Sequence, residues 1–379
     1  MAPMTHDHAL SPATLKDLAA RRHDACVSIF MPIDTAEPRH VGRTRLDNLV
    51  AEAQHVLRHE RDEPPARPII EQFGSLRRDG PNLSEGQGLA VFLDSDGHLE
   101  THHLPWPVPM RFSVGHRFAI TPLLPAARPA TFYVIALSRD RVRSFGGERG
   151  GLVELDLPLR PTEGTDEVPG ADSATNRLQA HSNGKDVVFH GHRDDTKGED
   201  ERLARLCRQT GEALRRHMSR RDLPVVVMAV TRLAALFKKE VDWMNVVAVV
   251  GGNPDSVGPE AIHARAWPSV AEHLEREVRA QEEELGDAVH HGRGSRDVAD
   301  IVLSAHDGRI EKLFVAPDEP RRWGTFDGSK RRVEVHDLRR PGDEDLVNLA
   351  VSETLCHGGE VITPLPGGGG TTLAAVYRH

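Results

Sequence analysis

Two histidines and a row of arginines are the residues of this chain whose types and spacing could do chemistry. His190 and His192 lie two residues apart at the start of a polar loop over residues 190–197, and His181 is nearby. An imidazole titrating near ~6.5 could serve as a general base toward an ester. Two histidines at this spacing could also bind a metal, but no third ligand has suitable spacing. We therefore predict no metal, and His190 and His192 are only weak candidates for catalysis, the favoured alternative being that the polar residues of this loop contact RNA.

The arginines follow this loop directly. Between Arg202 and Arg221 there are seven arginines and one acidic residue, although the formal net charge of the chain is −9. Guanidinium groups bind phosphates with paired hydrogen bonds, and neutralising several phosphates makes binding strongly salt-dependent. A solvated helical face is the alternative interpretation. We predict RNA contact by the residues of this region and by three arginines near the N-terminus: Arg39, Arg43, Arg45, Arg193, Lys197, Arg202, Arg205, Arg208, Arg215 and Arg216.

Composition narrows the class of protein. At 379 residues, with 38% hydrophobic and 28% charged residues, the chain suits two or three globular domains. It has no apolar run of the ~20 residues that a membrane-spanning helix needs, and residues 1–10 lack the pattern of a secretion signal. Cys26, Cys207 and Cys356 are far apart and are predicted to be buried free thiols. We expect a cytoplasmic protein without a membrane partner or a cofactor.

Three α/β segments are predicted, over residues 1–127, 128–262 and 263–379. In the first, Ser11 and Pro12 predict the start of a helix, and apolar periodicity predicts a long helix from Val41. Strands are expected at 26–31, 88–93 and 98–104. In the second segment, the arginines lie on a helix from Arg202 to about Met218. Strands are expected at 131–137, 142–145, 187–189, 224–230 and 246–250, with an aperiodic loop at 158–185.

The third segment is predicted to alternate helices and strands. Ser295 is expected to cap a helix before a strand at 310–315, and Asp343 to start a helix that ends near Gly358. A loop is expected at 317–332. A terminal hairpin is expected from strands at 361–364 and 372–377, with its turn at 367–370. Trp106 and Trp323 are weak candidates for stacking on bases. The fold class that follows is α/β.

The order of these pieces resembles the archaeo-eukaryotic class-one peptide release factors and Pelota, and more closely the bacterial proteins of that superfamily. In the first segment the resemblance is carried by the strand at 27–31, the arginine-led helix at 43–57 and the strand at 88–92. In the middle segment it is carried by the loop at His190 and the basic helix. The most specific match is the helix-to-strand unit at 297–315. The resemblance implies an RNase H-like middle domain and a ribosomal L30-like C-terminal domain.

Two motifs of that superfamily differ here. In release factors the loop before the basic helix carries Gly-Gly-Gln, which lets the backbone approach the ester and positions a water. The comparable loop of this chain offers Gly191 and no glutamine, and residues 38–43 stand where the stop-codon-reading motif would be. The resemblance then implies a tRNA-mimicking rescue or hibernation factor without codon reading or ester hydrolysis. Its partners would be rRNA, P-site tRNA and, through the C-terminal domain, a translational GTPase.

Two other classes of function, an enzyme and an interaction protein, stay open from the sequence. A peptidyl-tRNA hydrolase could use His190 or His192 in the altered loop, and a nuclease would also act in ribosome rescue. A stress-induced interaction protein that never contacts ribosomes is the third possibility.

Overall fold

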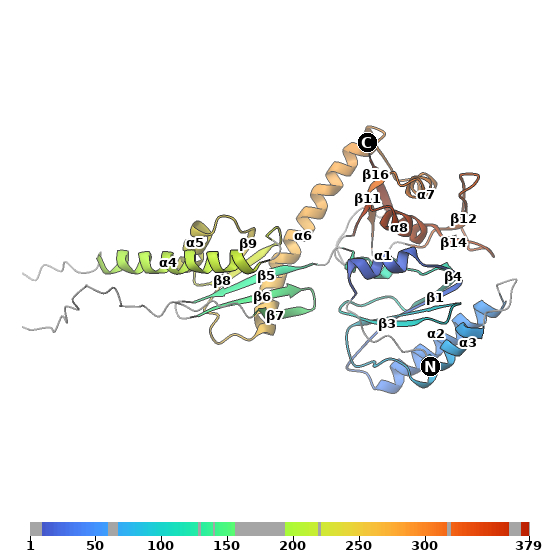
Figure 1. Cartoon of the computed structure of the whole chain (residues 1–379), viewed down its shortest axis with the longest axis horizontal. Helices are drawn as coiled ribbons and strands as arrows, with labels where there is room; N and C mark the ends of the chain where they lie inside the picture. The colour runs from blue at the N-terminus through green and yellow to red at the C-terminus, as the bar shows by residue number, and fades with distance from the viewer. Residues whose placement is uncertain are drawn as a thin grey trace, which may run out of the picture. The chain divides into compact units, whose positions relative to one another are not determined.

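The computed structural model describes residues 10–59, 67–127, 130–138, 141–155, 194–218, 221–316, 320–363 and 373–378. The chain forms two compact units, unit 1 with Met1–Ala130 and Glu272–His379, and unit 2 with Thr131–Ala271 (Figure 1). The first and third expected segments thus fall in one unit, while the expected three-domain partition stays a prediction. Over the described part of the chain, no helix combines the length and apolar character needed to cross a membrane.

The N-terminal half of unit 1 is an antiparallel sheet with helices on both faces. Its strands have the order β3-β2-β1-β4. The elements are α1 (Pro12–Ala20), β1 (Arg22–Pro32), α2 (Arg39–His59), α3 (Arg67–Arg78), β2 (Gly88–Asp94), β3 (Leu99–Leu104), β4 (Arg111–Arg117) and the 3-10 helix η1 (Thr121–Ala126). Ser11 caps α1 as predicted, since its side chain accepts a hydrogen bond from the Thr14 amide at 3.1 Å.

The alternation of side chains along β1 sends residues to two cores. Val27, Ile29 and Met31 pack against α2 and α3, whereas Phe30 packs against α1 on the opposite face. Helix α3 and strand β4 were not predicted. Pro68 lies in the first turn of α3, where proline is tolerated because the missing amide would have no partner. Pro68 therefore suits the beginning of a helix.

The C-terminal half of unit 1 contains two further sheets, with the orders β10-β16-β11-β15 and β13-β12-β14. Its elements are α6 (Pro259–His290, which begins in unit 2), β10 (Gly294–Ser295), α7 (Val298–His306), β11 (Ile310–Val315), β12 (Trp323–Asp327), β13 (Arg332–His336), β14 (Glu344–Asp345), α8 (Leu346–Cys356), β15 (Glu360–Ile362) and β16 (Leu373–Tyr377). The predicted strand at 310–315 is confirmed. The predicted loop at 317–332 is wrong where it holds β12.

The predicted terminal hairpin is wrong. Strand β11 lies between β15 and β16, pairing parallel with β15 and antiparallel with β16. The buried strand β11 thus gains partners on both edges, which a direct hairpin would not provide. The expected turn at 367–370 lies outside the described residues.

The two predicted helix starts of this half are also wrong. Asp297, not Ser295, caps α7 and accepts the Asp300 amide at 3.0 Å. Helix α8 is capped by Asp345, whose carboxylate accepts the Val347 and Asn348 amides. The carboxylate of Asp343 instead accepts the Arg340 amide at 2.8 Å and contacts His336. In both cases an acidic residue closer to the helix offers its oxygens to the first free amides.

One hydrophobic core joins the two halves of unit 1, with Phe92, Phe118, Leu313 and Val351 among its members. Within it the buried Asn348 side chain donates to the Phe118 carbonyl at 2.9 Å and accepts the Ile120 amide at 2.7 Å. At its margin the Glu353 carboxylate, 4% exposed, accepts hydrogen bonds from Arg22 and Arg117 at 2.5 Å each. Buried polar groups need hydrogen-bond partners, so these bonds hold the two halves of unit 1 in one arrangement.

Unit 2 is a five-stranded sheet with the order β7-β6-β5-β8-β9. Its elements are β5 (Phe132–Leu137), β6 (Val142–Glu148), β7 (Gly151–Leu155), α4 (Asp194–His217), β8 (Val225–Ala229), α5 (Thr231–Glu240) and β9 (Val246–Gly251). β5, β6 and β7 pair antiparallel, and β5, β8 and β9 pair parallel. This is the strand arrangement of an RNase H-like domain, and the α/β class is confirmed.

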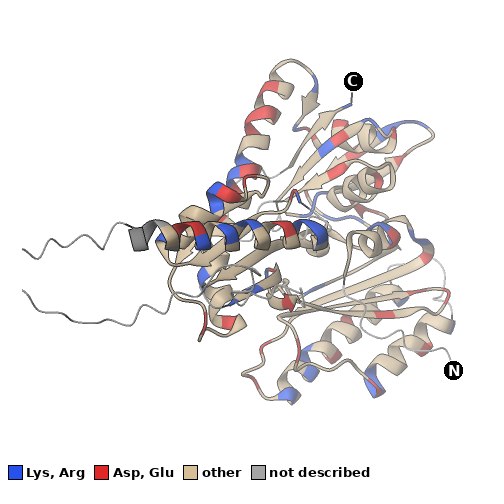
Figure 2. Cartoon of the chain, turned by 60° about the vertical axis from the view of Figure 1, so that its left-hand side comes forward, with Lys and Arg blue, Asp and Glu red and all other residues tan. Residues whose placement is uncertain are grey.

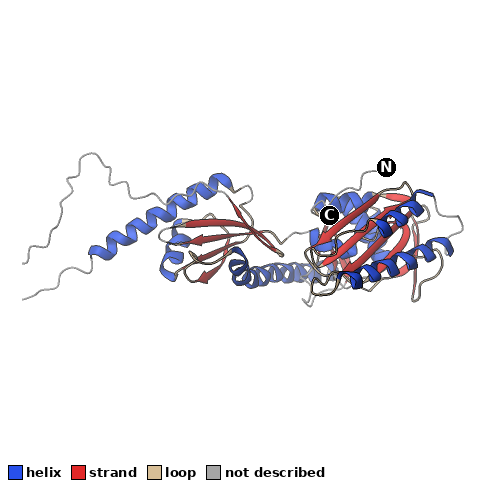
Figure 3. Ribbon diagram, turned by 90° about the horizontal axis from the view of Figure 1, so that it is seen from below, coloured by secondary structure: helices blue, strands red, loops and turns tan. Residues whose placement is uncertain are grey.

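Helices cover both faces of the unit 2 sheet (Figure 3). α4 and α5 pack on one face through Cys207, Leu214 and Phe237, and on the other Phe132 contacts His263 and Trp267 of α6. All five residues of β8 are buried, as its unbroken apolar run predicted. β7 and α5 were not predicted, and the expected loop at 158–185 and strand at 187–189 lie outside the described residues.

Candidate nucleic-acid interface

The exposed face of α4 carries the arginines. Leu203, Cys207 and Leu214 are buried against the sheet, so at 3.6 residues per turn the opposite side of the helix faces solvent. The described arginines of that side are all exposed: Arg202, Arg205, Arg208, Arg215 and Arg216. Figure 2 shows these positive charges along the helix. Five predicted RNA-binding residues therefore form one surface, which we call the arginine face.

Helix α5 holds the arginine face in place. Arg208 pairs with Glu240 at 2.7 Å, and Arg232 pairs with Asp200 at 2.6 Å. On each helix the two paired residues are eight positions apart, and the earlier residue of α4 pairs with the earlier residue of α5. The two helices therefore run in the same direction. Gly211 permits their close approach, because a Cβ atom there would lie 2.7 Å from the Val241 side chain. Exposed ion pairs contribute only ~0.2–1 kcal/mol each, so the packing of the helices does most of the positioning.

The other arginines of this face have no acidic partner in the described part of the chain. Neither Arg202 nor Arg205 has a described carboxylate oxygen within 4.0 Å, and Arg216 donates only to the Glu212 carbonyl at 3.3 Å. Exposed guanidinium groups without an internal carboxylate can bind phosphate without first breaking an ion pair. The arrangement is therefore suited to a polyanion.

Sequence reasoning missed the extension of the arginine face. Trp243 is half-buried between two guanidinium groups, with the Arg215 and Arg221 groups 6.0 and 5.9 Å from its ring centroid. Lys238 and Lys239 are exposed at the end of α5. The signal was the stretch 238–243, where two lysines precede an aromatic residue. Cations beside an aromatic ring are typical of nucleic-acid surfaces.

The candidate catalytic residues are not brought into any described arrangement. His190, His192 and Arg193 lie outside the described residues, as does the side chain of Lys197. The described backbone of α4 begins at Asp194. Its first two turns are acidic up to Glu201, which suits the positive end of the helix dipole. The basic surface therefore starts at Arg202.

The three N-terminal arginines have different surroundings. Arg39 is exposed at the start of α2. The Arg43 guanidinium donates to the Leu76 carbonyl at 3.2 Å and to the Arg77 carbonyl, at the end of α3. Arg45 makes two bonds to the Glu37 carboxylate at 2.7 and 2.9 Å. Arg43 and Arg45 thus have structural partners, whereas Arg39 is exposed.

The two tryptophans singled out from the sequence also differ. Trp106 is 8% exposed and donates its indole hydrogen to the Pro122 carbonyl at 3.2 Å, so its expected availability for base stacking is wrong. Trp106 is flanked by Pro105 and Pro107 in the sequence, and it packs into the shared core. Trp323 is half-buried at the edge of a cleft, between arginines.

Residues 131–309 match the family model described as bacterial archaeo-eukaryotic release factor family 3. This segment includes the whole of unit 2 and the helix-to-strand boundary after α7. No curated protein matches the sequence.

Solved structures also match the chain. An archaeal translation termination factor, aRF1, has 14% identity and a TM-score of 0.25, over 97% of this chain and 98% of that chain. The Archaeoglobus fulgidus Pelota has 14% identity and a TM-score of 0.34, over 76% and 79%. An archaeal Pelota from a model of ribosome-bound Pelota and ABCE1 has 11% identity and a TM-score of 0.40, over 98% and 95%. With TM-scores below 0.5, these likenesses establish no function for this chain.

Proposed function

Because the chain is release-factor-like over residues 131–309, we propose that it is a cytoplasmic, ribosome-associated translation factor that binds rRNA through unit 2. The observation that carries this proposal is the arginine face. Its exposed arginines lie along α4, and the guanidinium groups of Arg215 and Arg221 lie about 6 Å from the ring of the half-buried Trp243. Such a surface supplies both phosphate contacts and an aromatic partner for bases.

The proposed role is rescue or hibernation of ribosomes by a tRNA mimic. In this role unit 2 contacts large-subunit RNA with α4, and the loop before α4 points toward the end of P-site tRNA. Arg39, which is exposed on α2, is the proposed contact for small-subunit RNA among the three predicted N-terminal arginines. The C-terminal half of unit 1 is the proposed contact for a translational GTPase. The absence of Gly-Gly-Gln from the sequence supports a factor that hydrolyses no ester, and residues 38–43, which stand in place of the stop-codon-reading motif, support one that reads no stop codon.

Sedimentation of lysate from starved cells through sucrose gradients tests the ribosome contact. We expect the protein in the ribosomal fractions at low salt and its release as salt rises. A protein that stays at the top of the gradient in growing and starved cells would refute the proposal and favour an interaction protein that never binds ribosomes.

A peptidyl-tRNA release assay on purified ribosomes tests the hydrolase alternative. We expect no release above the rate without protein. Release that disappears in His190→Ala or His192→Ala would show that the loop is catalytic. In that case the ribosome contact would stand and the non-enzymatic role would be wrong.

A further inference from the structure

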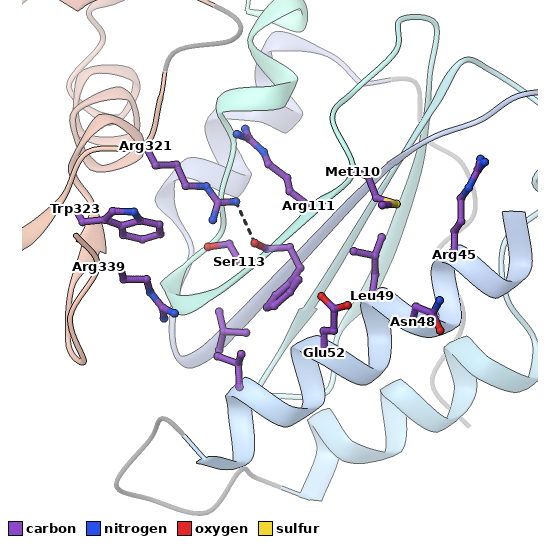
Figure 4. Close-up of a pocket in the computed structure, with 13 residues that line it drawn as sticks. Arg45, Asn48, Leu49, Glu52, Met110, Arg111, Ser113, Arg321, Trp323 and Arg339 are labelled. Carbon is purple, nitrogen blue, oxygen red and sulfur yellow. Dashed lines mark hydrogen bonds between the residues drawn. The ribbon is translucent and has the colours of Figure 1, made fainter. Parts of the chain in front are cut away.

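Unit 1 contains a cleft of about 410 Å³ between α2, β4 and the start of β12 (Figure 4). Four arginines and one carboxylate, that of Glu52, are among the residues that line it. The arginines come from both halves of the unit, Arg45 and Arg111 from the first and Arg321 and Arg339 from the second. The two halves share one core, so the cleft lies within one compact unit. Its charge predicts an anionic ligand.

Two of the arginines are largely withdrawn from water. The Arg111 guanidinium donates to the Thr121 hydroxyl at 3.0 Å, but its Nε is buried and has no hydrogen-bond partner. Burial and the charge of Arg321 lower the pKa of Arg111 to about 10. Burial also lowers the pKa of Arg321. Two desolvated positive charges repel each other, and an anion bound between them would reduce this repulsion.

The position of Arg321 is fixed by its contacts. Its Nη2 donates to the Phe112 carbonyl at 3.0 Å, and its Nε lies 3.9 Å from the Asp345 carboxylate. The Arg321 and Arg339 guanidinium groups lie 5.5 and 5.3 Å from the Trp323 ring centroid. The ring thus orients two cations at the mouth of the cleft. Guanidinium groups held in this way lose little side-chain entropy when an anion binds.

Apolar side chains form the adjoining wall. Met110 is 57% exposed, and it lines the cleft together with Leu49 and Phe112. An exposed methionine next to an aromatic side chain suits a flat apolar group. Inorganic phosphate would use only the arginines, and an acidic side chain has no flat group to cover the apolar wall. The lining therefore favours a ligand with an anionic and a planar end.

We propose that this cleft binds a phosphorylated nucleotide, with its phosphate on Arg111, Arg321 and Arg339 and its base against Met110 and Phe112. The same chemistry is offered by a free nucleotide and by a nucleotide within single-stranded RNA. The inference does not rest on the proposed ribosome contact, because the residues involved belong to unit 1 and the arginine face belongs to unit 2.

Calorimetric titration of the full-length protein tests this site, with GDP as the free nucleotide, a uridine trinucleotide as the RNA and inorganic phosphate as the control. We expect GDP or the trinucleotide to bind at least about tenfold more tightly than phosphate. Tighter binding of GDP identifies a free nucleotide as the ligand, and tighter binding of the trinucleotide identifies RNA. The site is refuted if both bind no better than phosphate.

Arg339→Glu and Arg340→Glu form a matched pair for this titration. Both residues are exposed and adjacent, and both variants change the charge by two, but only Arg339 lines the cleft. We expect Arg339→Glu to weaken nucleotide binding at least about tenfold and Arg340→Glu to change it much less. Equal effects would contradict a specific site. Arg321→Ala should also weaken binding, and the melting temperature without ligand checks that each variant is folded.

Discussion

At the scale of single residues, the arginines of this chain divide by what their guanidinium groups contact. Arg43 donates to carbonyls at the end of α3, and Arg117 donates to the buried carboxylate of Glu353. Arg202 and Arg205 point from α4 into solvent. A count of arginines in the sequence cannot separate these groups, because the carbonyl and carboxylate partners come from residues 33 and 236 positions away.

Replacing Arg43 with alanine is predicted to destabilise unit 1 by about 1 kcal/mol. The last carbonyls of a helix lack internal partners, and a charged donor to them stabilises by about that amount when it is partly exposed. Arg39→Ala is the control, since Arg39 is exposed nearby on α2 and should change stability by less than about 0.5 kcal/mol. Urea unfolding followed by circular dichroism measures both. Equal midpoints for the two variants would show that Arg43 does not cap α3.

Cys207 is predicted to be unreactive in the folded protein. It is buried in the core beneath α4, and burial raises the pKa of its thiol to about 11. At pH 8 only about one molecule in a thousand would carry the thiolate, which is the reactive form. Labelling with a thiol reagent, located by mass spectrometry, should modify Cys207 only after denaturant is added. Modification of Cys207 within seconds in native buffer would contradict its place in the core.

At the scale of elements, strong local patterns predicted helices and strands correctly. The pairing of strands that lie far apart in the sequence was missed. The apolar run of β8, the cap at Ser11 and the helix of arginines were all found from the sequence. The predicted terminal hairpin was wrong because β11 lies between β15 and β16. This position depends on helix α8, which crosses the sheet before β15. The spacing of the glycines in the sequence does not indicate that crossing. The five arginines of the arginine face were predicted from the sequence. Trp243 was missed because it is helix α5 that brings it beside this face.

Asp297, and not Ser295, caps the start of α7. Asp297→Ala should destabilise unit 1 by about 1 kcal/mol, because the carboxylate of Asp297 accepts a first-turn amide of α7. Ser295→Ala should cost less, since the Ser295 hydroxyl accepts the Asp297 amide outside the helix. Urea midpoints compare the two. A larger loss in Ser295→Ala would restore serine as the cap.

At the scale of the whole molecule, the chain is not a row of three independent segments. Unit 2 is continuous in sequence and has its own core, whereas unit 1 combines both ends of the chain around one core. Sequence patterns identify the segments but not which of them share a core, because this depends on contacts such as those of Asn348 with Phe118 and Ile120.

Expression of fragments tests this organisation. Residues 131–271 alone should unfold cooperatively, since the unit 2 core is complete within them. Residues 1–130 alone should lack a cooperative transition, because the Phe118 side of their core would be exposed. A sharp urea transition for residues 1–130, measured by circular dichroism, would show that the shared core is not needed for folding.

The arginine face is the proposed contact for ribosomal RNA. Its test compares Arg202→Glu/Arg205→Glu with Arg276→Glu/Arg279→Glu, a control pair of exposed arginines with the same spacing on α6. Each double variant changes the charge equally, and circular dichroism checks its helical content. The measurement is the dissociation constant for purified ribosomes between about 50 and 200 mM salt.

We expect the α4 variant to bind at least about tenfold more weakly than the wild type at low salt, with a shallower salt dependence. The α6 variant should bind like the wild type. If the α4 variant instead binds ribosomes as tightly as the wild type at every salt concentration, the arginine face is not the contact and the account is wrong.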